Sequence, residues 1–158
     1  MDKNVKIDLI EKIPFFINVH NQDKDLLADL AYFKAYKAGD AIIEQGSLQL
    51  SLIFLINGKV SVHIDDEFVI NFRGGGQPFG EMSFVNNDLA SATLTAETDC
   101  TFMCLDVEHL NSLTEPIHFR LRMHIYHACA EVLARKLKST NEIARSYKEK
   151  FGTDKDIN

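Results

Sequence analysis

The sequence is poor in the residues that mark several large classes of protein. It has no tryptophan, three prolines and three cysteines among 158 residues. An odd number of cysteines without a Cys-x-x-Cys pair favours neither a disulfide framework nor a zinc knuckle, so we expect Cys100, Cys104 and Cys129 to be buried free thiols. No apolar run approaches the ~20 residues of a membrane-spanning helix, and the first residues lack the charged-then-apolar pattern of a signal peptide. We therefore expect a cytoplasmic protein with no membrane partner.

Positive charge is also scarce. The chain has 17 basic and 23 acidic side chains, which gives a formal net charge of -6. This balance creates no field that attracts a phosphate backbone, and the basic residues of 135–150 alternate with glutamates, as on a solvated helix face. We expect no nucleic-acid partner.

The composition that remains is that of one ordinary domain. Apolar residues make up 46% and charged residues 25%, and a chain of this length buries a core without staples. A helical stripe over Val5–Ile13 ends at Pro14, and a second follows Asn21 with apolar side chains at Leu26, Leu27, Leu30 and Ala31. We expect two short N-terminal helices.

From residue 37 to residue 105 the pattern changes to short apolar or alternating runs separated by turn residues. The predicted strands are 41–44, 52–56, 60–64, 68–72, 92–96 and 101–105. Asn57-Gly58 is the strongest hairpin signal, because a type I′ turn needs positive φ at both central residues. The predicted fold class is mainly β with flanking α-helices, an antiparallel β-roll or jelly roll (double-stranded β-helix) rather than a parallel sheet.

After Glu115-Pro116 no Gly or Pro interrupts the chain until Phe151, so we expect one helix of about 34 residues and ~50 Å. Such a helix is longer than the domain is wide. A heptad seam runs along it, at Phe119, Met123, Tyr126, Ala130, Leu133, Leu137, Thr140, Ala144, Tyr147 and Phe151. A second stripe, Ile125, Cys129, Val132 and Ile143, is expected to cover the β-roll. We predict a two-fold homodimer through this helix; the alternative is a monomer whose helix folds back or packs on another domain.

Residues 79–93, Phe-Gly-Glu-Met-Ser-Phe-Val-Asn-Asn-Asp-Leu-Ala-Ser-Ala-Thr, resemble the phosphate-binding cassette of the cyclic nucleotide-binding domain family. The likeness continues upstream in Ile13-Pro14-Phe15-Phe16, Ala38-Gly39-Asp40, Gln45-Gly46 and residues 56–60. Downstream, residues 134–142 are similar to the long C-helix of catabolite activator proteins. The resemblance implies a β-roll with N-terminal helices over 1–116, the C-helix over 117–151 and a polar tail over 152–158. The chain ends seven residues after Phe151, so we expect no DNA-binding or other output domain after the helix.

The resemblance also implies a ligand site. Gly80 allows a cyclic phosphate to approach the backbone, and Glu81 accepts a hydrogen bond from the ribose 2′-hydroxyl. Met82 and Ser83 belong to the same ligand-binding set, and Ser91 and Ala92 offer backbone amides to the phosphate. The alternative for Glu81 is an acidic residue that stabilises a helix N-terminus.

The sequence departs from the family where the phosphate is held. Ala90 stands at the position of the usual arginine, and Leu89 at that of the preceding proline. Arginine donates two charge-assisted hydrogen bonds to phosphate oxygens. Its loss therefore predicts weaker phosphate binding unless Arg73, Arg135 or Lys136 replaces it. The alternative for each of these three is a charge that faces solvent.

At the other end of the site, Thr140 and Asn141 match the C-helix residues that cap the base in catabolite activator proteins. Thr140 is also the one polar side chain in the heptad seam, where a polar residue sets the register of a dimer. Both interpretations stay open.

Other chemistries find little support. His124 and His127 lie one helical turn apart without an acidic or Cys ligand in the usual close spacing, and His63 alone lies on a predicted strand, so neither a helical metal site nor a cupin centre is expected. There is no Gly-x-Ser-x-Gly elbow, and Gly74-Gly75-Gly76 lacks the Gly-Lys-Ser/Thr ending of a P-loop.

The sequence therefore predicts no enzyme and no cofactor. The first hypothesis is a homodimeric regulatory module that binds a cyclic nucleotide, cAMP-like, at a weakened phosphate site and signals to a protein effector. The second is a nucleotide-independent dimeric interaction scaffold with a degenerate pocket.

Overall fold

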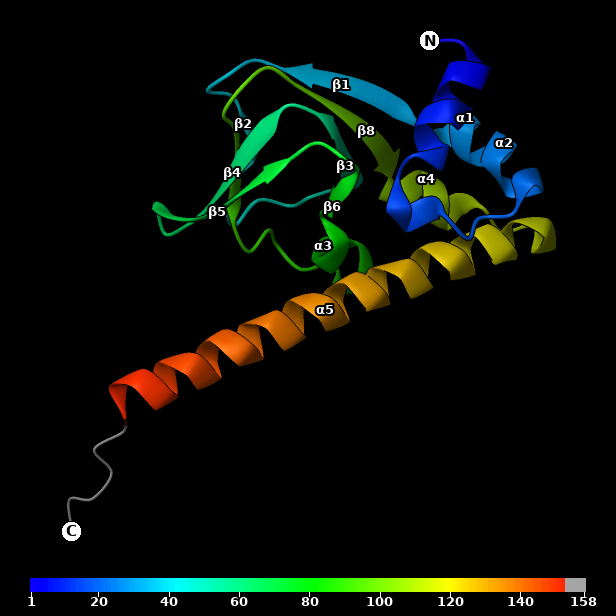
Figure 1. Cartoon of the computed structure of the whole chain (residues 1–158). Helices are drawn as coiled ribbons and strands as arrows, with labels where there is room; N and C mark the ends of the chain where they lie inside the picture. Colours follow the sequence, from blue (N-terminus) through cyan, green and yellow to red (C-terminus); the bar gives the residue numbers. More distant parts are fainter. Residues whose placement is uncertain (153–158) are drawn as a thin grey trace.

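The computed structural model describes residues 1–152; of the predicted polar tail 152–158, residues 153–158 lie outside the described residues. Two antiparallel sheets of four strands form the body, with helices on one side and a long helix beneath (Figure 1). The N-terminal helices are α1 (Lys3–Glu11), η1 (Pro14–Phe16) and α2 (Asn21–Leu30). The strands are β1 (Tyr32–Tyr36), β2 (Ala41–Ile43), β3 (Ser51–Asn57), β4 (Lys59–Ile64), β5 (Glu67–Arg73), β6 (Gln77–Phe79), β7 (Thr93–Ala96) and β8 (Cys100–Asp106). The remaining helices are α3 (Glu81–Asn86), α4 (Val107–Ser112), η2 (Pro116–His118) and α5 (Phe119–Phe151).

The strand order is β1-β8-β3-β6 in one sheet and β2-β7-β4-β5 in the other. In β3, Leu52 and Phe54 point to the helices, whereas Ile53 and Leu55 point to the opposite sheet. This strand is buried on both faces, which is why its sequence is a continuous apolar run. The arrangement confirms the predicted mainly antiparallel β fold with a long C-terminal helix.

The hairpin predicted at Asn57-Gly58 is wrong. β3 and β4 belong to different sheets, and Gly58 alone has positive φ, at +101°. A Cβ on Gly58 would lie 2.6 Å from the backbone oxygen of Asp99, so glycine is needed where the chain passes between the sheets. The two-residue hairpin turn lies instead at Asp65 and Asp66, which both have positive φ and join the paired strands β4 and β5.

The sequence pattern did not predict two of the strands, β1 and β6. β1 and β6 lie at the two edges of the first sheet. β6 has three residues and contains Pro78, which an edge strand tolerates because one side of it needs no ladder hydrogen bonds. β1 contains the strand formers Tyr32, Phe33 and Tyr36, but it follows almost directly on α2 and no turn residue marks its start. Pairing with β8 sets the bounds of β1, and pairing with β3 sets those of β6.

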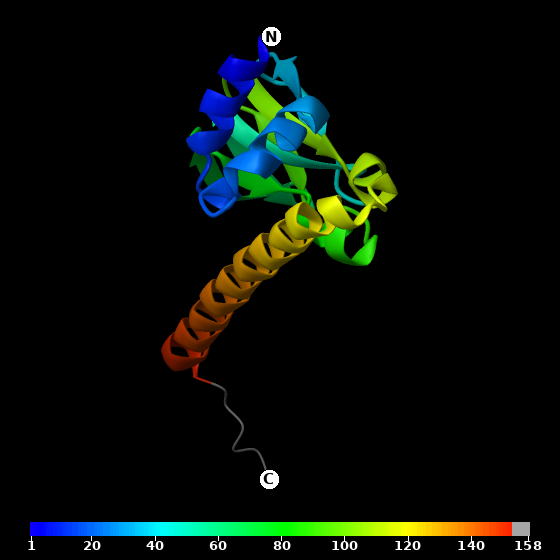
Figure 2. The same ribbon diagram turned by 90° about the vertical axis from the view of Figure 1, so that its right-hand side faces the viewer.

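Helix α5 is attached along its first half only. Leu121, Ile125, Cys129 and Val132 are buried against the N-terminal helices and the first sheet. Beyond them the helix extends past the body (Figures 1 and 2). The prediction that Ile143 covers the β-roll is wrong, since its side chain is 57% exposed. A straight helix touches the curved surface of the body over a limited length, so its distal side chains are exposed even where the apolar stripe continues.

An ion pair fixes the start of α5. Arg120 donates from Nε and Nη2 to the buried carboxylate of Asp23 in α2, at 2.6 and 2.9 Å. These hydrogen bonds hold the pKa of Asp23 below its ordinary value.

No helix among the described residues is long and apolar enough to cross a membrane.

Candidate functional site: a cavity between the second sheet and helix α5

The cassette predicted from residues 79–93 folds as a strand, a tight turn and a short helix. β6 ends at Phe79, Gly80 has φ +87°, and α3 begins at Glu81. A Cβ on Gly80 would lie 2.7 Å from the backbone oxygen of Ser51. Glycine is therefore required twice over, for its positive φ and for the close approach of β3.

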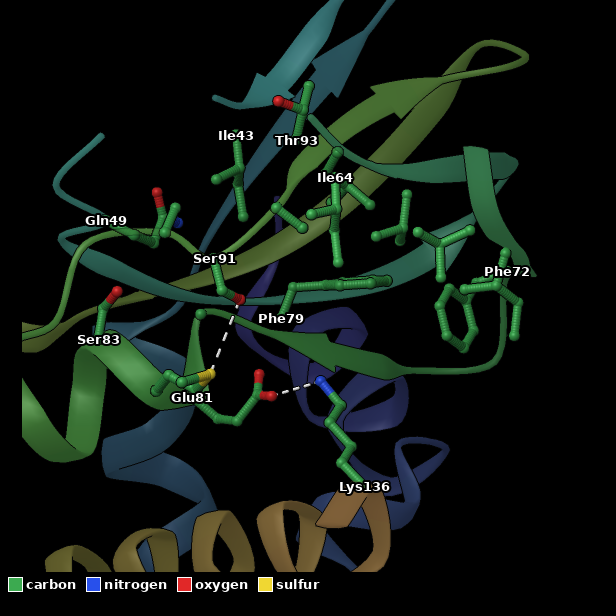
Figure 3. A pocket seen from close by; sticks show the side chains of 18 of the residues that line it. Ile43, Gln49, Ile64, Phe72, Phe79, Glu81, Ser83, Ser91, Thr93 and Lys136 are labelled. Carbon is green, nitrogen blue, oxygen red and sulfur yellow. Dashed lines mark hydrogen bonds and ion pairs between the residues drawn. The ribbon is translucent and has the colours of Figure 1, made fainter. Parts of the chain in front are cut away.

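This turn lies at the floor of a cavity of about 420 Å³ (Figure 3). The cavity is bounded by β2, β4, β5, the segment around Ser91 and one face of α5. Its lining residues are Ile43, Gln49, Val62, Ile64, Val69, Ile70, Phe72, Phe79, Gly80, Glu81, Met82, Ser83, Ala90, Ser91, Ala92, Thr93, Leu94, Lys136, Ser139 and Thr140. The volume falls in the range of small-molecule sites, roughly 300–1,000 Å³.

Eight of the nine site residues predicted from the sequence meet at this cavity: Gly80, Glu81, Met82, Ser83, Ala90, Ser91, Ala92 and Thr140. Asn141 does not reach it. One residue further along α5, it faces a shallow groove with Leu137 and Arg145 on another side of the helix. Ser139 and Thr140 line the cavity, and Asn141, about 100° further round the helix than Thr140, lies beyond its edge.

Glu81 is the buried charge of the cavity. Its side chain is 4% exposed, and its Oε1 accepts a hydrogen bond from the ammonium of Lys136 in α5 (Figure 3). The sequence had suggested Lys136 as a substitute for the missing phosphate arginine. The structure instead pairs it with Glu81, the predicted sugar-binding residue.

The end of the cavity where the sequence predicts the phosphate offers backbone amides, and within residues 1–152 no cation lines it. Ala90 is tied to the turn before β3, because its N–H donates to Ser47 (2.8 Å) and its carbonyl accepts from Gly46 (2.7 Å). Within residues 1–152 the amides of Ser91 and Ala92 have no hydrogen-bond partner. The Ser91 hydroxyl lies 3.7 Å from the sulfur of Met82. These groups can bind an anion, although no cationic side chain among residues 1–152 lies beside them to neutralise its charge.

The α5 end is polar. Thr140 donates from its hydroxyl to the backbone oxygen of Lys136, at 2.9 Å, which leaves the hydroxyl oxygen as an acceptor toward the cavity. Ser139 lines the cavity beside it, although no motif in the sequence marks this residue. The apolar wall from β4 and β5, which includes Ile64, Ile70 and Phe72, also carries no sequence signal of a ligand site. Their alternation predicted strands but not which sheet face encloses a ligand-sized space.

The other cations proposed for the phosphate lie elsewhere. Arg73 pairs with Lys59 across the β4–β5 ladder and does not line the cavity. Arg135 lines a second cavity of about 310 Å³ between α5 and the η1 turn, together with His124 and His127. Among the described residues no group of His, Cys, Asp and Glu could hold a metal ion.

All three cysteines are buried and free, as predicted. Burial raises the pKa of the Cys104 thiol to about 11 and that of Cys129 to about 12, which keeps both protonated at neutral pH. Protonated, enclosed thiols are poor nucleophiles.

The fold can be compared with that of known proteins. The family model of the cyclic nucleotide-binding domain matches residues 33–116. The chain belongs to this family. The match covers the strands from β1 to β8 and α4, and the residues after 116 lie outside it.

Members of the family among characterised proteins include kinase regulatory subunits. The chain is 31% identical, over 69% of its length, to the type II regulatory subunit of a cAMP-dependent protein kinase from Drosophila melanogaster. The chain matches 30% of the length of that subunit.

Solved structures show the same fold. The regulatory subunit of a cAMP-independent protein kinase A from Trypanosoma brucei has a TM-score of 0.71 at 25% identity, over 92% of this chain and 49% of that one. A variant of the T. brucei subunit with three substitutions, one of them threonine to arginine, was solved with cAMP in its A site (TM-score 0.68, 26% identity, 85% and 46% covered). The catabolite activator protein of Thermus thermophilus has a TM-score of 0.70 at 24% identity, over 84% and 62%.

Proposed function

We propose that the chain is a non-catalytic regulatory module whose cavity takes a ligand of the cyclic nucleotide class. The sugar would lie at Glu81, the phosphate at the amides of Ser91 and Ala92, and the base toward Thr140. The observation that carries this proposal is the pairing of buried Glu81 with Lys136 of α5. A sugar hydroxyl that donates to Glu81 must share or displace Lys136, so ligand occupancy and the position of α5 are coupled.

The phosphate is expected to be held weakly. Ala90 provides no guanidinium, and the loss of one partner from a desolvated charge pair costs on the order of 2–5 kcal/mol, or at least about thirtyfold in affinity. The T. brucei subunit, described as cAMP-independent, and its cAMP-bound variant with an introduced arginine support this expectation.

Isothermal titration calorimetry with cAMP and cGMP tests the proposal. We expect weak binding to the natural chain and binding at least about thirtyfold tighter in Ala90→Arg. Ala38→Arg, in the exposed turn after β1, adds the same charge away from the cavity and should change nothing. Absence of heat for both proteins at millimolar ligand would contradict the proposal.

We propose that the chain forms a homodimer and that the dimer transmits ligand binding to a protein effector. The similarity to a kinase regulatory subunit supports a protein effector. Leu137, Tyr147 and Phe151 of the heptad seam are exposed on the distal part of α5, where another helix can pack on them. Light scattering at micromolar concentration should report a dimer. Leu137→Glu should dissociate it, whereas Ser146→Glu, on the opposite side of α5, should not; a monomeric natural chain would remove the dimer from the proposal.

The second candidate is a dimeric interaction scaffold that works without a nucleotide. Ala90 favours it, because this residue offers no guanidinium that could hold a phosphate. Calorimetry separates the two candidates: a scaffold with a degenerate cavity binds no cyclic nucleotide, even after Ala90→Arg.

A further inference from the structure

The second cavity, of about 310 Å³, lies against the packed part of α5. Three segments that are far apart in the sequence enclose it: the η1 turn (residues 14–18), the loop and strand of residues 75–78, and α5 from residue 124 to residue 135. Within residues 1–152 no residue lines both this cavity and the cassette cavity. Its volume lies at the lower end of the range of small-molecule sites, roughly 300–1,000 Å³.

Two residues of the Gly74-Gly75-Gly76 run, Gly75 and Gly76, form part of the wall. A Cβ on Gly74 would lie 2.6 Å from the backbone oxygen of Ile56, and one on Gly76 would lie 2.9 Å from Ile13, so close packing requires both glycines. A Cβ on Gly75, whose φ is +119°, would meet no atom within 4 Å. Within residues 1–152 the backbone N–H of Gly75 has no hydrogen-bond partner. The middle glycine therefore leaves a backbone donor that a ligand can approach.

The α5 wall carries a cation, Arg135, that pairs with no acid within residues 1–152. Glu131 lies one turn before Arg135, at a spacing where an ion pair would be ordinary. The Oε1 of Glu131 lies instead 3.4 Å from Nε2 of His127, on the preceding turn. The guanidinium of Arg135 therefore keeps its N–H donors for a ligand. The half-buried His124 lines the same cavity and adds a second imidazole.

Hydrogen-bond donors prevail among the polar groups of this cavity. The donors are Arg135, the two imidazoles, the Asn18 amide and the N–H of Gly75, whereas Glu131 is the single carboxylate among the described lining residues. The side chain of Glu131 is 57% exposed, so water screens its charge. This set of donors suits an oxyanion, because a guanidinium donates two parallel hydrogen bonds to a carboxylate or a phosphate. Most of the remaining lining is apolar: Pro14, Phe15, Ile17, Pro78, Ala128 and Val132.

We propose that the second cavity binds a small organic anion, a carboxylate or a phosphate monoester that carries an apolar body. The anionic group would lie on Arg135 and the imidazoles, and the apolar body against Ile17 and Val132. The bound anion would then join α5 to the η1 turn and to the loop at Gly75. This inference goes beyond the proposed function, because it concerns a different cavity and needs no cyclic nucleotide.

The test uses the full chain and follows the imidazole signals of its six histidines by nuclear magnetic resonance, with His124→Gln and His127→Gln to assign the two that matter. Phenyl phosphate and benzoate present the two anionic groups on the same ring, and benzyl alcohol is the neutral control. At least one anion should shift the signals of His124 and His127 saturably, and benzyl alcohol should bind about tenfold or more weakly. The anion that binds more tightly identifies the preferred group.

Two results of this titration overturn the inference. Shifts that do not saturate, or that affect all six histidines alike, indicate an adventitious ion only. Equal affinity for benzyl alcohol and for both anions shows that the charge is not recognised.

Three substitutions locate the ligand. Arg135→Gln should weaken the tighter anion about tenfold or more, and Arg135 is exposed, so the variant should fold. Lys138→Gln removes the same charge from a residue outside the cavity and should change nothing. Ala90→Arg adds a cation to the cassette cavity and should leave the affinity measured at His124 unchanged. Unchanged binding in Arg135→Gln overturns the inference. Tighter binding in Ala90→Arg would place the anion in the cassette cavity, which overturns the inference and leaves the proposed function standing.

Discussion

The two parts of α5 differ in how they are held, although they form one unbroken helix. From Phe119 to Val132 the helix is packed into the core and anchored by the Arg120–Asp23 pair. From Leu133 to Phe151 it carries apolar side chains that remain largely exposed, and Lys136 is its bond to the cassette. The cavity lies where the packed part gives way to the free part. Under the proposed function, a ligand at Glu81 would act on the portion of the helix that the core does not hold.

The largest expected effect comes from truncation in the packed part. Ile125→Ala should lower the free energy of unfolding by about 2–5 kcal/mol, because a fully buried side chain leaves a cavity in the core. Ile143→Ala, the same change in the free part, should stay within about 0.5 kcal/mol. Urea unfolding followed by circular dichroism measures both, and equal losses would erase the distinction between the two parts.

The Arg120 anchor should come next. Arg120→Met removes two charge-assisted hydrogen bonds and leaves Asp23 buried without its cation, which should destabilise the chain by about 1.5–3 kcal/mol. Arg122→Met, two positions along, removes a single 3.3 Å hydrogen bond to the backbone oxygen of Leu113 and should cost less. The same unfolding curves compare the two variants.

The anchor also predicts a pH dependence. Because Arg120 holds the pKa of folded Asp23 below its ordinary value of 3.8, this pair stabilises the fold fully above that pH. The contribution is lost as the pH falls through the depressed pKa. Stability measured from pH 7 down to pH 2 should therefore fall less steeply below about pH 4 in Asp23→Asn, although that variant is less stable at neutral pH. Parallel curves would show that Asp23 does not contribute to acid unfolding.

The smallest effect is expected at Lys136. Lys136→Met removes the bond that ties the free part of α5 to Glu81, so amide hydrogen exchange in residues 137–151 should quicken. Lys138→Met makes the same change at an exposed lysine without a bond to the cassette and should leave exchange unchanged. Equal exchange in the two variants would mean that the pair does not restrain the helix.

Local sequence was sufficient for the cassette and for the existence of α5. Gly80 has to be glycine at a positive φ, and the residues that follow it in the resemblance meet at one cavity. Local sequence did not predict the connection at Asn57-Gly58 correctly. A hairpin needs its two flanking strands to pair with each other, and here the two strands belong to different sheets. The same limit applied to β1 and β6, which exist through their neighbours' hydrogen bonds.

The amino-acid sequence by itself determined the class of fold, the family and the missing cation at Ala90, because periodicity and motif spacing are local properties of the chain. The tertiary structure alone decided that Lys136 reaches Glu81, that Thr140 faces the cavity while Asn141 does not, and that Ile143 stays exposed. The exposure of Ile143 and the orientation of Thr140 and Asn141 depend on how far the straight helix α5 follows the curved surface of the body. The Lys136–Glu81 contact depends on how the fold brings together residues 55 positions apart in the chain.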